Sequence, residues 1–261
     1  MVVSIRYWSE AMGLIAAGDQ KGESMLTPLA QRLLDPAGWD PYLEDPGTPW
    51  LLHWQLLHHP ERATLAYLLF TQFPADRFDK DQVLQWLERG LRNMPHVRAT
   101  SRSLERDFDV LVRTYLPAHS ARGHYGEDSF DSPLIELGLL RRLSRQNYEF
   151  VRGEQPSLPL ALVAYAVVQF WQRTAPAQNT LALERLMYDP GSPGATFKLN
   201  ESAFIERLLR IAVILGLHYD DTAGVRVVSR SRPWSEEDAL AQLDAYYMGT
   251  SATLPPSRAQ A

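Results

Sequence analysis

The chain has 261 residues, of which 45% are hydrophobic and 22% charged, and its formal net charge is −5. Such a chain can bury a core, which excludes an intrinsically disordered protein, and the lack of cysteine excludes disulfides, thiolate nucleophiles and cysteine-ligated metals. With this charge, any nucleic-acid surface must be a local patch, built mainly from the 23 Arg rather than the 3 Lys. A GC-rich genome that favours arginine codons is the alternative explanation of that bias.

The sequence predicts no membrane contact. No stretch reaches the roughly 18 to 20 uninterrupted apolar residues that cross a bilayer. Residues 1–6 also lack the basic and then apolar pattern of a signal peptide. We therefore expect a cytoplasmic protein.

The first predicted unit, residues 1–34, is a partial helix-turn-helix. Ile5, Trp8, Met12 and Ile15 recur at the three- and four-residue steps of a helix with one buried face. Thr27 followed by a proline predicts the cap and first position of a second, short helix that ends at residue 34. Because a helix opens at residue 2, we expect the chain to begin inside a module.

A Trp- and Asp-rich helical region is predicted over residues 35–116. Proline and glycine make its first part an ordered loop, and Ser101 is the predicted cap of its last helix. The two last helices flank a turn through Pro95 and His96, which predicts a helix-turn-helix. The predicted elements are the loop over 35–48 and helices over 49–58, 61–73, 80–93 and 101–116.

Residues 117–157 are predicted to be a polar loop and connector, and residues 158–230 a winged-helix-like module. Asn200 caps a strong helical pattern in that module, and the alternation around residues 221–224 predicts a hairpin. A C-terminal helix and a disordered tail are expected over 231–261. The elements predicted between 158 and 230 are helices over 158–171, 181–187 and 201–215, a strand over 196–199 and the hairpin over 217–228. The fold class is therefore mainly α, with helix-turn-helix or winged-helix modules and short β-hairpins.

An acidic, aromatic segment at residues 38–46 is the first candidate site. Between residues 35 and 60 there are four carboxylates and no Lys or Arg, so an outside cation or hydrogen-bond donor must relieve their repulsion. Asp40, Glu44 and Asp45 are candidate Mg²⁺ ligands and catalytic groups, with His53 as a general base or further ligand. The alternative is that Asp40 and Asp45, each followed by proline, cap helices and tie turns, which is the commoner use of such residues.

The aromatic residues Trp39, Tyr42, Trp50 and Trp54 also allow two interpretations. They could stack on bases, as in proteins that bind single strands. The spacing of four between Trp50 and Trp54 on an apolar helix favours a role in the core.

A basic run forms the second candidate site. Seven Arg and three acidic residues lie between residues 89 and 122, on and around the second helix of the predicted helix-turn-helix. Such side chains bind phosphates. The alternative is a solvated helix face on which Glu105, Asp107 and Asp109 pair with some of the arginines. Other arginines lie on the first helix and on the predicted wing, so the candidate DNA-binding set is Arg6, Arg98, Arg102, Arg106, Arg226 and Arg230.

Several segments resemble the SspB family, the nicking component of a bacterial single-strand DNA phosphorothioation system. The central one, residues 38–54, contains Asp-Pro-Tyr-Leu-Glu-Asp-Pro and Trp-Leu-Leu-His-Trp. Similar segments are Ser-Ile-Arg-Tyr-Trp at 4–8, Arg-Asp at 106–107 leading to Tyr115, Ser-Pro-Leu-Ile-Glu-Leu at 132–137 and Ser-Pro-Gly-Ala-Thr-Phe-Lys-Leu at 192–199. Family members carry an upstream Gly-His-Glu-Thr-Phe-like motif with no counterpart here, so we expect a shortened first module.

The resemblance implies DNA nicking that supports sulfur incorporation into the DNA backbone. It also implies three protein partners: a cysteine desulfurase, an ATPase and an ATP-pyrophosphatase-like protein. With the acidic segment it gives our first hypothesis, a DNA nickase dependent on Mg²⁺ or another divalent metal. The alternatives are a catalytically silent DNA-binding adaptor that recruits the sulfur-transfer enzymes, and a protein scaffold. Paired helix-turn-helix modules further predict a homodimer.

Overall fold

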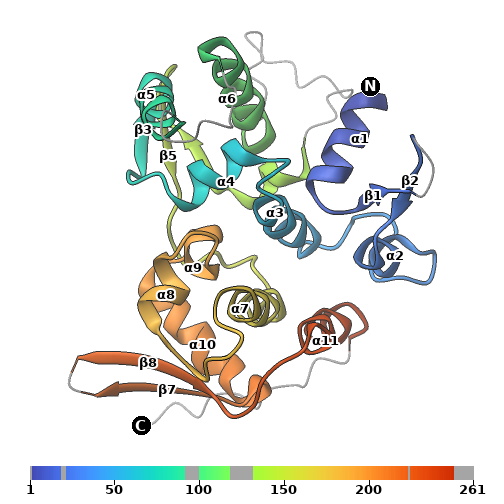
Figure 1. Ribbon diagram of the computed structural model, residues 1–261, viewed down its shortest axis with the longest axis vertical. Helices are drawn as coiled ribbons and strands as arrows, with labels where there is room; N and C mark the ends of the chain where they lie inside the picture. Colours follow the sequence, from blue (N-terminus) through green and yellow to red (C-terminus); the bar gives the residue numbers. More distant parts are fainter. Residues whose placement is uncertain (1, 19–21, 92–99, 118–131, 223, 250–261) are drawn as a thin grey trace.

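The structure, a computed structural model, describes residues 2–18, 22–91, 100–117, 132–222 and 224–249, without the side chains of residues 2–4 and 91. Within these ranges helices predominate, and the strands form small sheets of two or three members (Figure 1). The prediction of a mainly α protein is therefore confirmed. None of the described helices is both long and apolar enough to cross a bilayer.

The N-terminal part contains α1 (Val2–Ala11), the antiparallel hairpin of β1 (Ile15–Ala17) and β2 (Ser24–Leu26), and α2 (Pro28–Leu34). Thr27 caps α2 as predicted, because its side chain accepts a hydrogen bond from the Ala30 amide at 3.2 Å. The sequence did not predict the hairpin. Its strands have only three residues each and are largely exposed, so they carry no alternation of apolar residues.

A first helix-and-sheet unit follows the central helix, α3 (Thr48–His58). Its strands are β3 (Arg77–Asp79), β4 (Leu140–Arg142) and β5 (Asn147–Phe150). They form one antiparallel sheet in the order β3-β5-β4, and a 3₁₀ helix, η1 (Pro133–Leu137), precedes β4. The Ser101 hydroxyl donates to Glu88 at 2.7 Å and so joins α6 (Ser101–Tyr115) to α5 (Lys80–Leu91). In chain order the unit contains α4 (Thr64–Thr71), β3 (Arg77–Asp79), α5 (Lys80–Leu91), α6 (Ser101–Tyr115), β4 (Leu140–Arg142) and β5 (Asn147–Phe150).

The second unit has a similar order, with an additional short helix, α9 (Pro193–Thr196), and with its last helix leading directly into the hairpin rather than through a 3₁₀ helix. Its sheet has the corresponding arrangement β6-β8-β7, in which the first strand pairs with the third. Asn200 caps α10 as predicted and accepts from the Ala203 amide at 2.8 Å. The elements are α7 (Leu160–Thr174), β6 (Thr180–Ala182), α8 (Leu183–Tyr188), α9 (Pro193–Thr196), α10 (Glu201–Leu215), β7 (Leu217–Thr222) and β8 (Val225–Arg230).

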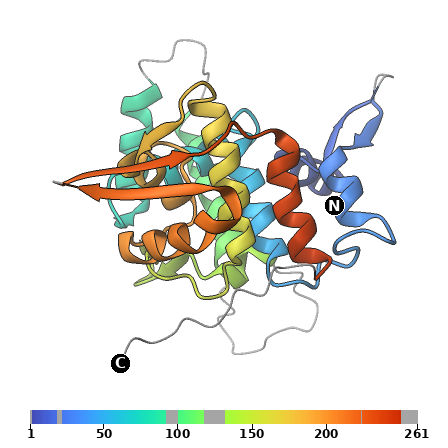
Figure 2. The ribbon, with the colours of Figure 1, turned by 90° about the horizontal axis from the view of Figure 1, so that it is seen from below.

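The central helix, α3 (Thr48–His58), lies between the two units (Figure 1). Every residue of α3 from Thr48 to Leu57 is buried, which places the tryptophans Trp50 and Trp54 in the core, as their spacing predicts. The last helix, α11 (Glu236–Tyr247), packs against α7, and Figure 2 shows the β7–β8 and β1–β2 hairpins at opposite ends of the molecule. One continuous core therefore includes both units.

Two local predictions are wrong. Residues 196–199 are not a strand. Ser192 caps the short helix α9, which extends to Thr196, and beyond it only a single β-bridge joins Leu199 to Gly153. The cap of α6 is Thr100 rather than Ser101, in a reciprocal capping box with Ser103. The predicted turn through residues 95 and 96, the loop over 118–131 and the tail from residue 250 lie outside the described residues.

The packing of α8 on α9 gives a first prediction. A Cβ at Gly194 would lie 2.7 Å from both the Cα and the carbonyl oxygen of Met187, which are backbone atoms that cannot rotate away. We expect Gly194→Ala to lower the free energy of unfolding by about 1–3 kcal/mol, measured by urea denaturation. Gly153→Ala is the matched control, since a Cβ there meets no atom within 4 Å. Equal stability of the two variants would contradict this packing.

Candidate nucleic-acid interface

Asp40 organises the acidic loop that precedes α3. Its carboxylate accepts hydrogen bonds from the amides of Glu44 (2.9 Å) and Asp45 (3.0 Å) and from the Thr48 hydroxyl (2.6 Å). The side chain is only 7% exposed. Burial acts to raise its pKa, but the hydrogen bonds from Thr48 and the loop amides outweigh burial and lower it. Asp40 is therefore an ionised carboxylate that ties the loop to the start of α3.

Helix α11 supplies an outside donor to the acidic loop. The Tyr246 hydroxyl donates to Asp45 at 2.7 Å, and Asp45 also accepts from the Gly47 amide at 2.7 Å. Trp39 stacks on Tyr247 with ring centroids 5.3 Å apart. Helix α11 therefore packs on the loop, although the two are about 200 residues apart in the sequence.

This loop does not fit a magnesium ion. Both Asp40 oxygens are already occupied by hydrogen bonds, and the Glu44 side chain is exposed. Across the described ranges, no three His, Asp or Glu side chains are close enough together to hold a metal ion. The structure thus favours the capping alternative for Asp40 and Asp45, and it does not bring Asp40, Glu44 and Asp45 together as ligands.

His53 is fully buried in α3 and links three helices. Its Nε2 lies 2.9 Å from the carbonyl oxygen of Thr196, which can only accept, so Nε2 carries the proton and donates. Its Nδ1 therefore accepts from the Tyr115 hydroxyl at 2.6 Å. Burial lowers the pKa of His53 to about 4, with the nearby Lys198 charge as a smaller cause. The catalytic role predicted for His53 finds no support, because the neutral ring has no access to solvent.

Lys198 is a buried polar residue to which the sequence analysis gave no role. Its Nζ donates to the Phe70 carbonyl oxygen at 2.5 Å and lies 4.1 Å from the Phe150 ring centroid. Burial, with the neighbouring Arg152 charge as a smaller cause, lowers its pKa to about 7. Only the short segment in which it lies resembled the family, and no spacing in the sequence indicated these partners.

The C-terminal arginines are used within the fold. The Arg230 guanidinium lies 5.5 and 5.4 Å from the ring centroids of Trp171 and Trp234 and donates to the Pro176 carbonyl, and the residue is 5% exposed. We therefore remove Arg230 from the candidate DNA-binding set. Arg226 is paired with Glu201 (2.5 Å) and Glu184 (2.7 Å), which offsets its charge.

Unlike the C-terminal arginines, those of helix α6 are exposed and are not paired with carboxylates in the described part of the chain. Arg102, Arg106 and Arg113 are exposed and, at spacings of four and seven, lie on one face. No ion pair joins them to a carboxylate within the described part of the chain, and Lys80 already neutralises Asp109 at 2.8 Å. Arg6 on α1 is exposed too but pairs with Glu10 at 3.0 Å. The candidate Arg98 lies outside the described residues.

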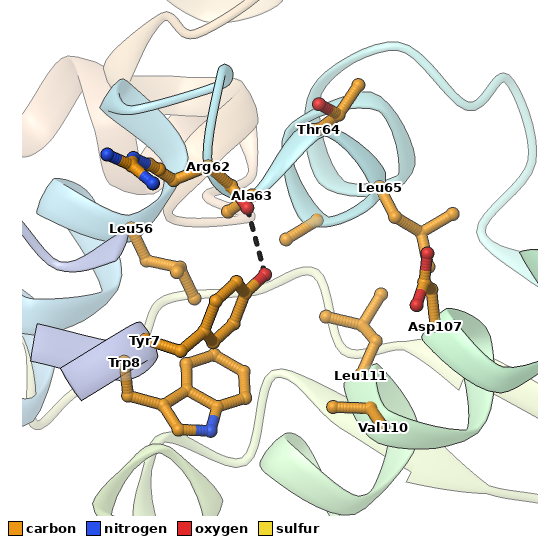
Figure 3. Close-up of a pocket in the computed structure, with 11 residues that line it drawn as sticks. Tyr7, Trp8, Leu56, Arg62, Ala63, Thr64, Leu65, Asp107, Val110 and Leu111 are labelled. Carbon is orange, nitrogen blue, oxygen red and sulfur yellow. Dashed lines mark hydrogen bonds between the residues drawn. The ribbon is translucent and has the colours of Figure 1, made fainter. Parts of the chain in front are cut away.

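A cavity of about 170 Å³ lies between α1, α6 and the start of α4. Figure 3 shows Tyr7 and Trp8 on one side and Val110 and Leu111 on the other, with Asp107 at the rim. The Tyr7 hydroxyl donates to the carbonyl oxygen of Arg62 at 2.9 Å. No local pattern in the sequence indicates this cavity, because its walls on α1 and α6 are about 100 residues apart in the chain.

The chain is similar to a protein family and to solved structures over most of its length. Residues 1–247 match the family described as "Protein of unknown function (DUF4007)". A crystal structure of magnesium ion-bound SspB superposes with a TM-score of 0.83 at 32% identity, over 99% of this chain and 78% of that one. A second SspB crystal structure gives 0.83 and 32% over 98% and 77%. No curated protein matches the chain.

The fold and the family match define a mainly α protein of the DUF4007 class. The likeness to the two solved structures extends over almost the whole chain. The chain belongs to the SspB family.

The role of Asp40 gives a second prediction. Asp40→Ala removes an ionised acceptor of three hydrogen bonds, so we expect the free energy of unfolding at pH 7 to fall by about 2–3 kcal/mol. The folded pKa lies below the ordinary 3.8, so the stabilisation is complete above pH 3.8 and is lost as the pH falls through the folded pKa. The difference from wild type should therefore shrink only in acid.

Urea unfolding with and without Mg²⁺ checks this expectation, and Glu44→Ala, on the same loop, is the control. Both variants and the wild type should respond alike to Mg²⁺. Stabilisation of the wild type by Mg²⁺ that disappears in Asp40→Ala would show instead that the loop binds the metal.

Proposed function

We propose that this chain is the DNA-contacting component of a bacterial DNA phosphorothioation system, and that the arginine face of α6 grips the DNA backbone. The observation that carries the proposal is the group of exposed arginines, Arg102, Arg106 and Arg113, without carboxylate partners within the described part of the chain. Guanidinium groups bind phosphate oxygens by paired hydrogen bonds. The association with phosphorothioation comes from membership of the SspB family.

The element order supports this placement of the DNA. In both units a helix, a strand and further helices are followed by a two-stranded hairpin, with the first strand paired to the third. We interpret each unit as a winged-helix module, in which α6 and α10 are the last α-helices before the hairpin; the 3₁₀ helix η1 lies between α6 and β4 in the first unit. In helix-turn-helix proteins the helix at that position enters the major groove.

The two corresponding helices differ in what they expose. Helix α6 exposes three arginines, whereas α10 exposes one, Arg210, beside the apolar residues Leu209 (52%), Val213 (81%) and Ile214 (47%). The hairpin after α10 carries Asp220 and Asp221, and its Arg226 is already paired with two glutamates. We therefore place the phosphate contacts on the first unit. The apolar face of α10 suits a protein surface better than a phosphate backbone.

Nicking is the second candidate function. The observation that favours it is the magnesium-bound state of one SspB crystal structure. The described residues of this chain offer no three-residue metal site, so the structure assigns no residue to the cleavage step. The silent adaptor is the alternative, and it needs only the α6 surface.

The partners of such a component follow from the family resemblance. They are a cysteine desulfurase, an ATPase and an ATP-pyrophosphatase-like protein, each proposed here to meet DNA through this chain. The homodimer stays a prediction from the sequence.

Binding to DNA gives the third prediction. The double variant Arg102→Gln/Arg106→Gln removes two guanidiniums, so we expect roughly tenfold weaker binding to a fluorescent duplex at low salt. The slope of log K against log salt should become less steep by about 2, because two fewer counterions are released. Fluorescence anisotropy over a range of salt concentrations measures both quantities.

Arg226→Gln is the matched control, because its charge is already offset by Glu184 and Glu201. It should leave the affinity and the salt slope nearly unchanged. If Arg226→Gln loses binding and the α6 variant does not, the DNA lies on the second unit and the proposed surface is wrong.

Strand cleavage is the fourth prediction. If the chain nicks, supercoiled plasmid should convert to open circle with Mg²⁺ and not with a chelator, and the α6 double variant should lose this conversion with its DNA binding. Gel analysis measures both forms. DNA retention without conversion under any divalent metal would reject nicking by this chain and leave the adaptor.

A further inference from the structure

The cavity between α1 and α6 has the size and walls of a site for one flat ring. Its volume of about 170 Å³ is below the roughly 300–1,000 Å³ of pockets for drug-sized ligands. Figure 3 shows the Tyr7 and Trp8 rings facing Val110 and Leu111 across the cavity. Tyr7 (45%) and Val110 (37%) are exposed there, so apolar surface is left open to water. A planar apolar body would cover it.

The polar groups of the cavity offer hydrogen-bond acceptors. The hydroxyls of Tyr7 and Thr64 already donate, to the carbonyl oxygens of Arg62 and Pro60, so they present lone pairs. The Asp107 carboxylate at the rim can only accept. The Arg62 guanidinium does not supply a donor, because it turns away from the cavity toward Glu10 at 3.1 Å (Figure 3). The site therefore suits a flat group that carries N–H donors.

The cavity adjoins the arginine face. Arg106 immediately precedes Asp107 and lies one helical turn before Val110, so a phosphate held by Arg106 would lie beside the mouth of the cavity. A nucleotide places its base within reach of its own phosphate. If DNA lies on α6, its nucleobases, which are flat rings that can carry amino donors, are therefore within reach of the cavity.

We propose that the cavity accepts one unstacked, amino-bearing nucleobase of the DNA strand that the α6 arginines hold, with the base against Tyr7 and Trp8 and its amino edge on Asp107. The inference rests on the proposed DNA-binding function. Guanine fits the donor pattern best, because N1–H and N2–H₂ lie on one edge and meet two carboxylate oxygens. Thymine fits worst, because its single N–H lies between two carbonyls.

The test compares single-stranded ten-nucleotide probes with equal numbers of phosphates: all thymidine, one central deoxyguanosine in thymidine, and one central abasic site in thymidine. Anisotropy at low salt should show the deoxyguanosine probe binding at least about fivefold tighter than the other two, which is the smaller end of base-stacking effects. Asp107→Asn and Val110→Trp, which remove the acceptor and fill the cavity, should abolish the ratio. The ratio is the readout, so changes in overall affinity do not affect it.

Two matched variants serve as controls. Asp109→Asn removes a carboxylate from the same helix outside the cavity, and Val213→Trp adds an indole to an exposed position of α10; both should keep the ratio. Equal affinity of the wild type for all three probes would overturn the nucleobase site and leave DNA binding intact. Absence of binding to every single-stranded probe, with the duplex still bound, would overturn this inference alone. Absence of binding to the duplex as well would overturn the proposed function, and this inference with it.

Discussion

The arrangement of the two units depends on a buried imidazole. His53 in α3 donates to the Thr196 carbonyl of α9 and accepts from the Tyr115 hydroxyl at the end of α6. Of the two neutral tautomers, only the one with its proton on Nε2 satisfies both partners, and burial, which lowers the pKa of His53 to about 4, keeps the ring neutral at pH 7. One side chain therefore fixes the C-terminal end of α6 relative to the second unit. The end of the helix that carries the exposed arginines is thereby held inside the core.

Charge is distributed unevenly over this acidic chain. Several arginines are bound by carboxylates, as Arg32 is by Glu237 and Asp244, or are buried among aromatic rings, as Arg230 is. These arginines stabilise contacts between elements. Because they are paired or buried, they contribute little electrostatic attraction for a ligand. The arginines of α6 differ because, within the described residues, no ion pair joins them to a carboxylate, although Glu105 lies near them in the sequence, and Asp109 is neutralised by Lys80. A net charge of −5 therefore coexists with a local basic surface.

Much of the fold could be predicted from the sequence wherever local signals decide it. Helix α10 has the predicted limits because Asn200 satisfies its first amides and Gly216, at φ 64°, ends it. The β7–β8 hairpin follows from alternation, and Thr27 begins α2 as expected. Predictions failed where partners are distant in sequence: the hydroxyl of Tyr246 on Asp45, the tryptophans around Arg230, and the cavity between α1 and α6. No local pattern encodes these contacts, so the acidic loop resembled a metal site until the hydrogen bonds to Asp40 were known.

Amide hydrogen exchange, measured with and without saturating DNA, tests the central claim most directly, because it reports where the backbone becomes protected without altering any residue. The account predicts slower exchange in α6 and in the adjoining α1, with α10 and the β7–β8 hairpin unchanged. Protection confined to α10 and that hairpin, with α6 unaffected, would contradict it.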